Sequence, residues 1–196
     1  ASNGVGGKCE LLGDMVKAVD ENNDEELELP KLAIIGQPHV GKSSLLNACI
    51  GEQRTIVTPI AGTIRDTIYT RYQSFGFDFL LIDTAGLLKK KVVKEDIEFY
   101  SVMRSIRAIE EADVCLLLID ATSGFNVQDM NIFHLMERNK KGCVIIVNKW
   151  DLVEKETNST KKLEEEIHEK LAPFSDVPIV FTSVKTKQRI HKALEV

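Results

Sequence analysis

Residues 36–43 read Gly-Gln-Pro-His-Val-Gly-Lys-Ser and fit the pattern G-x-x-x-x-G-K-[ST]. Glycines let main-chain N–H groups converge on phosphate oxygens, and a helix start adds about half a positive charge. Lys42 would neutralise the outer phosphates of a nucleotide, and the Ser43 hydroxyl would bind Mg²⁺. A chance glycine turn is the alternative, but the spacing and both flanks agree with a phosphate site. The residues predicted to surround the phosphates are Gly36, Pro38, His39, Val40, Gly41, Lys42, Ser43 and Ser44.

A second candidate motif follows the apolar run of residues 77–82. Residues 83–86 read Asp-Thr-Ala-Gly, a pattern that is also common in turns. Ligands bind at the carboxyl ends of strands in an α/β sheet, so this position favours a nucleotide role. We expect Asp83 to hold Mg²⁺ through water and the Gly86 N–H to sense the γ-phosphate.

Residues 148–151 read Asn-Lys-Trp-Asp and follow the apolar run 143–147. One carboxylate can accept both donors that guanine presents, its N1–H and its exocyclic amine. Adenine lacks both, and would leave Asp151 unpaired at a cost of at least ~1–3 kcal/mol. The Lys149 stem can lie on the base plane, and Asn148 can tie loops together. Three residues after the run 179–181 have backbone N–H groups that could reach guanine O6: Ser183, Val184 and Lys185.

Short apolar runs alternate with helix-period segments and would position these motifs. The strand candidates are residues 32–35, 77–82, 114–119, 143–147 and 179–181. Residues 67–73, with Gly76 before the next run, predict an antiparallel hairpin and a sixth strand. Helices are expected near residues 42–49, 99–109, 127–137, 163–171 and 187–194. Continuous apolar strands are buried on both faces, so we predict a doubly wound α/β domain with a mainly parallel six-stranded sheet and helices on both faces.

Composition limits the function classes. The chain has 196 residues, of which 43% are hydrophobic and 28% charged, as is ordinary for a globular protein. The net charge of −5 excludes a generic nucleic-acid binder, and no apolar run approaches the ~20 residues of a membrane helix. Cys9, Cys49, Cys115 and Cys143 lack metal-type spacing, so we expect thiols in a reducing, cytoplasmic setting without a membrane partner.

The first thirty residues differ from the rest. Residues 1–19 combine a glycine-rich loop with one amphipathic helix pattern, and such a helix must dock on a domain. Residues 20–30 are strongly acidic and end at Pro30, as is typical of a solvated linker. Residues 31–196 form the main domain.

Five motifs carry a resemblance to a known family. They are residues 36–43, 61–66 (Ala-Gly-Thr-Ile-Arg-Asp), 83–86, 99–104 (Phe-Tyr-Ser-Val-Met-Arg) and 147–152 (Val-Asn-Lys-Trp-Asp-Leu). From residue 32 to about 194 the chain resembles the Era group of Ras-like P-loop GTPases, and most closely the second G domain of the bacterial Der (EngA) family. Members of that family have two tandem G domains and a C-terminal KH-like domain.

The resemblance implies a G domain that uses GTP, GDP and Mg²⁺, and that hydrolyses GTP during assembly of the large ribosomal subunit. Residues 1–19 would then end a preceding G domain, and residues 20–30 would be the interdomain linker. The implied partners are guanine nucleotide, the ribosome or its rRNA, the preceding G domain and the KH-like domain. The implied catalytic residues are Lys42, Gly86 and Thr63, and the implied metal ligands are Ser43, Thr63 and Asp83.

The chain departs from the family pattern at three positions. Ile64 replaces a threonine and cannot bind a metal, so either Thr63 substitutes or the closed switch is weakened. His39 replaces the asparagine of potassium-stimulated relatives, and because imidazole is a poor K⁺ ligand we expect no potassium activation. Val184 replaces alanine but keeps its backbone N–H. A fourth position agrees with the family but differs from Ras-type enzymes: Leu87 stands where they have a glutamine. Leu87 cannot orient water as that glutamine does, so we expect slow hydrolysis, near the ~10⁻⁴ s⁻¹ of unassisted Ras.

Two other hypotheses stay open. Ile64 and Leu87 also fit a nucleotide-gated scaffold whose hydrolysis is negligible. A tRNA-modification GTPase domain of the Era group is the second, although the helix pattern in residues 1–19 favours a tandem G domain. Phosphate release from GTP but not from ATP would separate an enzyme from a scaffold.

Overall fold

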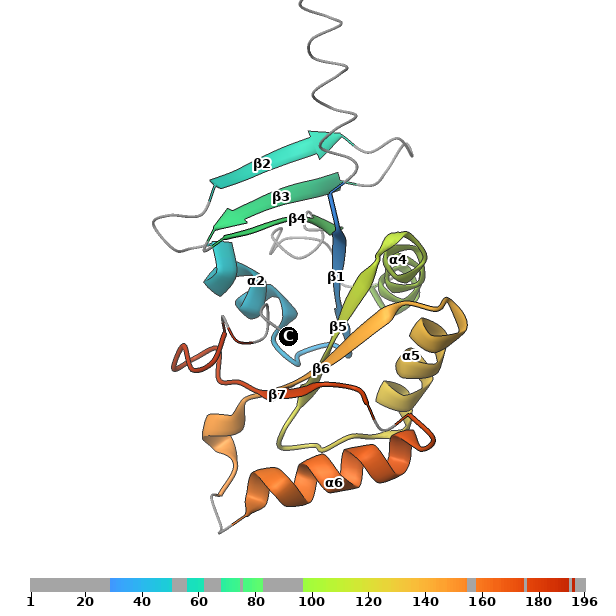
Figure 1. Cartoon of the computed structure of the whole chain (residues 1–196), viewed down its shortest axis with the longest axis vertical. Helices are drawn as coiled ribbons and strands as arrows, with labels where there is room; N and C mark the ends of the chain where they lie inside the picture. The colour runs from blue at the N-terminus through green and yellow to red at the C-terminus, as the bar shows by residue number, and fades with distance from the viewer. Residues whose placement is uncertain are drawn as a thin grey trace, which may run out of the picture.

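The computed structural model describes residues 29–50, 56–61, 68–74, 76–82, 97–154, 158–174, 176–190 and 192. Its elements are β1 (Lys31–Gly36), α2 (Lys42–Ile50), β2 (Ile56–Ala61), β3 (Ile68–Ser74), β4 (Phe77–Ile82), α4 (Ile97–Glu111), β5 (Val114–Asp120), α5 (Val127–Arg138), β6 (Gly142–Asn148), the 3₁₀ helix η1 (Trp150–Leu152), α6 (Ser159–Leu171) and β7 (Ile179–Phe181). Within these ranges seven strands form one sheet in the order β2-β3-β4-β1-β5-β6-β7 (Figure 1). The helix and acidic linker expected over residues 1–28 lie outside the described part.

Five strands, β4, β1, β5, β6 and β7, run parallel and confirm the predicted mainly parallel sheet. Residues 115–119 of β5 are all buried, because helices cover both faces of the sheet. Their unbroken apolar run is what two-sided burial requires. The carboxyl ends of these strands therefore lie at one edge, beyond Gly36, Asp120 and Asn148.

The predicted hairpin is confirmed, since β3 pairs antiparallel with β4 around Gly76, whose φ is +83°. The sheet nevertheless has seven strands in the described residues instead of six. The additional strand, β2, pairs antiparallel with β3 at the edge of the sheet. Pro59 within β2 has no N–H to donate, which an edge strand tolerates and which obscures a strand pattern in the sequence.

The core has two layers, one on each face of the sheet. On one face α4, α5 and α6 supply buried residues such as Ile109, Met136 and Ile167. On the other face α2 supplies Leu45 and Leu46. Figure 1 shows α2 on one side of β1 and α4 and α5 on the other. Both faces of the parallel strands are thus covered, and the carboxyl edge stays available for loops.

Four of the helices expected after residue 40 are present as α2, α4, α5 and α6. The helix expected from about residue 187 is wrong over its described start. Lys187 and Arg189 have φ values of +56°, which a right-handed helix cannot contain, and Ser183 forms an isolated bridge with Gln188. The segment up to Ile190 is therefore a series of turns, with Ile190 buried against the α2 face.

The described helices include none that is both long and apolar enough to cross a lipid bilayer. Cys115 and Cys143 are neighbours on β5 and β6 and carry free thiols. Burial raises the pKa of Cys115 to about 11 and that of Cys143 to about 12, so both stay protonated and unreactive. Cys9 lies outside the described residues.

Candidate functional site

The phosphate loop joins β1 to α2 and takes its shape from two glycines. Gly36 has a φ of +149°, and a Cβ there would lie 2.3 Å from the carbonyl oxygen of Leu118 in the neighbouring strand. Gly41 has a φ of +105°, a backbone conformation that side chains rarely adopt. Val40 is buried between them, whereas Pro38 and His39 are exposed. The loop conformation therefore depends on the main chain more than on the side chains at its tip.

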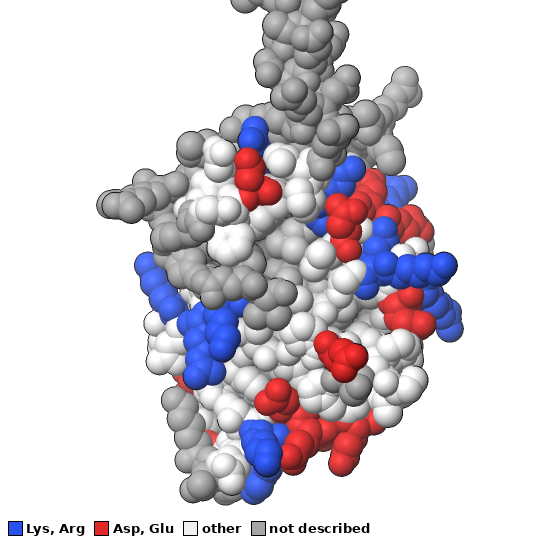
Figure 2. Space-filling view, viewed as in Figure 1, with Lys and Arg blue, Asp and Glu red and all other residues white. Residues whose placement is uncertain are grey.

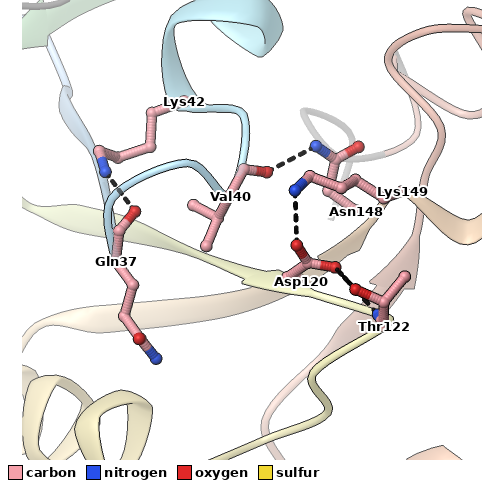
Figure 3. Close-up of polar contacts among 7 residues, drawn as sticks. All are labelled: Gln37, Val40, Lys42, Asp120, Thr122, Asn148 and Lys149. Carbon is pink, nitrogen blue, oxygen red and sulfur yellow. Dashed lines mark hydrogen bonds and ion pairs between the residues drawn. The ribbon is translucent and has the colours of Figure 1, made fainter.

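Lys42 lies at the first turn of α2 and points back over the loop (Figure 3). Its amine donates to the carbonyl oxygens of Gly36 at 2.8 Å and Gln37 at 2.6 Å. Burial lowers the pKa of Lys42 to about 8. Ser43 beside it is half-buried, and Ser44 is exposed. A cation thus lies over a loop of main-chain N–H groups at a helix start, an arrangement that attracts phosphate.

The phosphate loop is also anchored to α5, through a contact that sequence reasoning missed. The Gln37 side chain donates to Oδ1 of Asn126 and to Oδ1 of Asp129, both at 2.8 Å. Asn126 and Asp129 form the capping box at the start of α5. Asp129 is 1% exposed, and burial raises the pKa of its carboxyl despite these hydrogen bonds. A single sequence cannot reveal a contact between residues that are 92 positions apart. The only signal available in the sequence was the capping-box pattern of Asn126 and Asp129, which marks a helix start.

Asn148 joins the phosphate loop to the loops at the base end of the site. It is 3% exposed, and its Nδ2 donates to the carbonyl oxygen of Val40 at 2.8 Å (Figure 3). Its Oδ1 accepts from the backbone N–H of Val184 at 3.2 Å and from the Thr182 hydroxyl at 3.5 Å. A Cβ on Gly41 would lie 2.4 Å from the same Nδ2, so this junction also needs a glycine. One buried amide therefore connects three loops at the sheet edge.

Asp151 follows in η1 and is held by the loop after β7. The hydroxyl of Ser183 donates to its Oδ1 at 2.5 Å, and the same hydroxyl accepts from the backbone N–H of Thr186 at 3.2 Å. Ser183 is completely buried, and Lys185 is exposed. Trp150 packs edge-on against Phe181 with ring centres 4.7 Å apart, as expected for a packing role rather than stacking on a base.

Lys149 has a left-handed backbone, with a φ of +62°. Its amine forms an ion pair of 2.5 Å with Oδ2 of Asp120 at the end of β5. Oδ1 of Asp120 accepts from the Thr122 backbone N–H at 2.9 Å and from the Thr122 hydroxyl at 2.7 Å. Burial alone raises the pKa of Asp120, but the hydrogen bonds from Lys149 and Thr122 hold it below its usual value. Sequence reasoning missed Asp120, although a carboxylate at the end of the apolar run 114–119 was the available signal.

These loops place a phosphate-binding turn and a carboxylate at one sheet edge, joined by Asn148. A family model described as "50S ribosome-binding GTPase" matches residues 31–149. The chain belongs to this GTPase family. The match begins with β1 and ends inside the Asn148–Asp151 motif, so it covers the phosphate loop and the strands that present the base loops.

Individual proteins of this GTPase family are also similar to the chain in sequence. The chain is 58% identical over 196 residues to GTPase Der of Christiangramia forsetii and 57% identical over 192 residues to GTPase Der of Bacteroides fragilis. These alignments cover 100% and 96% of this chain but 45% and 44% of the relatives. The chain thus spans less than half the length of the curated relatives it matches, and corresponds to one G domain. The predicted resemblance to the Der family is confirmed.

Solved structures of GTPases show the same fold. Era of Aquifex aeolicus bound to GDP·AlF₄⁻ has a TM-score of 0.62 at 27% identity, covering 84% of this chain and 54% of that protein. Era in complex with MgGDPNP and nucleotides 1506–1542 of 16S ribosomal RNA has a TM-score of 0.63 at 27% identity, covering 85% and 54%. The predicted Ras-like G-domain fold is confirmed.

Three of the residues expected to act in this GTPase site, Thr63, Asp83 and Gly86, lie outside the described part of the chain. The strand ends that flank them are described. Ala61 at the end of β2 pairs with Ile68, and Tyr69 pairs with Ile82 at the end of β4. The chain therefore enters and leaves segment 62–67 beside the carboxyl end of β4, and it enters segment 83–96 from that same strand end.

The fit of Mg²⁺ can be tested on Ser43. Its hydroxyl is half-buried at the start of α2, beside the Lys42 amine, and oxygen is the donor that this hard cation prefers. The described residues contain no cluster of three acidic, histidine or cysteine side chains that would bind a metal without a nucleotide. Ser43 therefore offers one oxygen ligand for Mg²⁺ beside the phosphate loop.

Proposed function

We propose that this chain is a guanine-nucleotide switch domain that binds GTP and hydrolyses it slowly. The observation that supports the proposal best is the 2.8 Å hydrogen bond from Asn148 to the Val40 carbonyl. It puts the phosphate loop and the base loops within one amide side chain of each other. A nucleotide can then contact Lys42 with its phosphates and Asp151 with its base.

Base selection rests on Asp151. The Ser183 hydroxyl and the short η1 helix orient its carboxylate before any ligand arrives. Guanine satisfies that carboxylate with two N–H donors, whereas adenine leaves it without them. A site built on such hydrogen bonds rejects a misfit by as much as ~10⁴-fold. The backbone N–H of Lys185 is the proposed contact to guanine O6, because the N–H of Val184 already donates to Oδ1 of Asn148.

Phosphate binding rests on the loop amides of residues 36–44 and on the Lys42 amine. Lys42 exchanges its present carbonyl acceptors, Gly36 and Gln37, for phosphate oxygens. When bound, Mg²⁺ supplies positive charge to the β- and γ-phosphates, and Ser43, Thr63 and Asp83 are the residues proposed to hold it. We do not assign K⁺ a role, because the exposed His39 offers imidazole in place of an oxygen ligand.

Hydrolysis is proposed to be slow without a partner. Leu87 follows Gly86 and cannot orient water as glutamine does. We expect single-turnover phosphate release from GTP near ~10⁻⁴ s⁻¹, and none from ATP. Release above a few per second by the chain alone would contradict slow hydrolysis. A complete lack of release with intact GTP binding would favour the scaffold hypothesis.

The wider role is assembly of the large ribosomal subunit in the bacterial cytoplasm. Support comes from the family description, 50S ribosome-binding GTPase. The Era relative was solved with 16S rRNA, which belongs to the small subunit, so it supports contact with ribosomal RNA but not the choice of subunit. Figure 2 shows acidic and basic side chains intermixed on the visible face, in keeping with the net charge of −5. Ribosome contact would thus need a specific surface instead of general attraction to RNA.

The domain layout is proposed from the same relatives. Similarity to GTPase Der extends over residues 1–30 as well as the G domain, which a tRNA-modification GTPase would not explain. Residues 1–19 are proposed to end a preceding G domain, residues 20–30 to be the linker, and residues 31–196 to be the second G domain. A KH-like domain would follow in the full-length protein.

The experiment is a titration of the whole chain with labelled GDP, GTP, ADP and xanthosine diphosphate. The wild type is expected to prefer guanine nucleotides over ADP by at least 100-fold, about 2.8 kcal/mol. Asp151→Asn should reverse the preference between guanosine and xanthosine diphosphates, because an amide can donate to the extra xanthine oxygen. Asp113→Asn is the control, because Asp113 precedes the amino end of β5 and so lies at the opposite end of the strands from the site. Unchanged selectivity in Asp151→Asn would remove the base-recognition argument.

A further inference from the structure

Lys149 and Asp120 belong to neighbouring strand ends. In the β5–β6 register Asp120 is opposite Asn148, and the backbone N–H of Ala121 donates to the Asn148 carbonyl at 2.9 Å. Lys149 is the next residue, and its left-handed backbone turns its side chain back toward β5, where its amine meets Asp120 (Figure 3). The lysine stem therefore lies along the sheet edge between the two strands.

Each oxygen of Asp120 has its own partner. Oδ1 accepts both hydrogen bonds from Thr122, and Oδ2 accepts the Lys149 amine. Thr122 thus fixes the orientation of the carboxylate independently of Lys149. The side chain of Asp120 is 16% exposed and that of Lys149 is 31% exposed, so the pair is more protected than a surface ion pair. The charge that holds the lysine is already in place in the protein without a ligand.

We propose that Asp120 is a positioning residue for guanine-nucleotide binding, because it holds the Lys149 stem extended across the edge beside Asp151, where the stem supports the base. The inference rests on the proposed function of the same site. Without Asp120 the lysine would sample many rotamers, and a nucleotide would have to order it on binding. Thr122 supports the same arrangement one step further away.

The test uses labelled GDP and GTP with the whole chain. In Asp120→Ala both nucleotides should dissociate about tenfold faster, because losing a charge-assisted hydrogen bond and ordering a lysine side chain have that order of effect. The maximal hydrolysis rate at saturating GTP should not change, since Lys149 does not reach the phosphates in this arrangement. Unchanged dissociation rates would overturn the proposal.

A double-mutant cycle separates positioning from general damage. In a Lys149→Met background, adding Asp120→Ala should alter GDP dissociation by less than about twofold, because the group that Asp120 positions is gone. An equal tenfold effect in both backgrounds would show that Asp120 does not act through Lys149, and would overturn the proposal. Urea unfolding of each variant reports whether the fold is retained.

Milder variants keep the test decisive if Asp120→Ala does not fold. Asp120→Asn keeps an acceptor without the charge, and Thr122→Val keeps the charge without its hydroxyl partner, so each should speed GDP release about threefold. A rate of GDP release that is unchanged in both variants would overturn the proposal.

The matched control is Asp78→Ala. Asp78 accepts two hydrogen bonds from Arg71 on the β3–β4 hairpin, at 2.9 and 2.7 Å, and its loss should leave GDP release unchanged. A wild type without guanine preference would contradict the proposed function. A guanine-selective wild type with no Asp120–Lys149 coupling would contradict only this inference.

Discussion

The phosphate end and the base end of the sheet edge are held in different ways. At the phosphate end the loop conformation comes from Gly36 and Gly41, and the tip residues Pro38 and His39 are exposed. At the base end a network of side chains holds Asp151 and Lys149, each through its own short contact. The first end should therefore tolerate changes of its exposed tip side chains, with the Lys42 cation as the exception, whereas the second should be sensitive to several single side chains.

The difference follows from the ligand groups. Phosphate oxygens accept from any N–H, so main-chain donors and one cation are sufficient. A base is distinguished by the pattern of its donors and acceptors, which needs a carboxylate in a fixed orientation. Asn148 is the exception, because its side chain serves both ends at once.

The largest effect is expected from the phosphate-loop main chain. Gly36→Ala should destabilise the fold by about 3 kcal/mol or more, because the new Cβ would meet the Leu118 carbonyl oxygen at 2.3 Å and φ is +149°. Gly124→Ala is the control. Gly124 has a φ of +66° but open space around it, so a cost of about 1 kcal/mol is expected. Equal urea unfolding midpoints for Gly36→Ala and Gly124→Ala would show that the fold does not depend on the main-chain conformation of the phosphate loop.

The second-largest effect is expected from Lys42→Ala. Removing the cation over the loop should weaken GDP binding about 100-fold, near 3 kcal/mol. The ratio of GDP to inosine diphosphate affinity should stay constant, because base contacts lie at the other end. Titration calorimetry measures both constants, and Lys161→Ala on the exposed face of α6 should change neither. A collapse of the base preference would show that the two ends are not separate.

Asn148→Ala should affect both ends. It leaves the Val40 carbonyl and the Val184 N–H without their present partner, so a loss of about 2 kcal/mol in unfolding free energy is expected, with GDP affinity about tenfold lower. Asn139→Ala removes a comparable side-chain bond to the Leu135 carbonyl at the end of α5. That control should cost stability while GDP affinity is retained. An Asn148→Ala protein that binds GDP normally would disprove the junction.

The smallest effects on GDP affinity are expected from substitutions of two serines. Ser183→Ala removes the 2.5 Å bond to Asp151 and should weaken GDP binding about fivefold, near 1 kcal/mol, and should lower guanine preference. Ser44→Ala, in the exposed first turn of α2, should change GDP affinity less than about twofold, since only its backbone N–H is expected to contact phosphate. The reverse order would contradict the assignment of main-chain and side-chain roles.

The sequence predicted the parallel core strands well, because two-sided burial produces unbroken apolar runs such as residues 114–119. It missed β2, whose residues include a proline at the sheet edge. It also predicted a helix start at residues 187–190, where an apolar periodicity was overridden by turns with positive φ. Local pattern does not reveal which face of the sheet an isolated residue such as Ile190 will cover.

The candidate site likewise contains residues that the sequence predicted and residues that it missed. The motifs of residues 36–43 and 148–151 were visible because a fixed spacing serves one local turn. The contact of Gln37 with Asp129 joins the end of β1 to the start of α5, and that of Lys149 with Asp120 joins the ends of β6 and β5. These segments are far apart in the chain, and only the fold brings them together. Residues whose role is to hold another functional side chain leave little signal in a single sequence.

The most direct measurement is a crystal structure of the whole chain with GDP and Mg²⁺. The account predicts the guanine N1–H and exocyclic amine on the Asp151 carboxylate, the base against the Lys149 stem, and the β-phosphate at the Lys42 amine. A base turned away from Asp151, or phosphates outside the loop of residues 36–43, would contradict the shared site on which the proposed function rests.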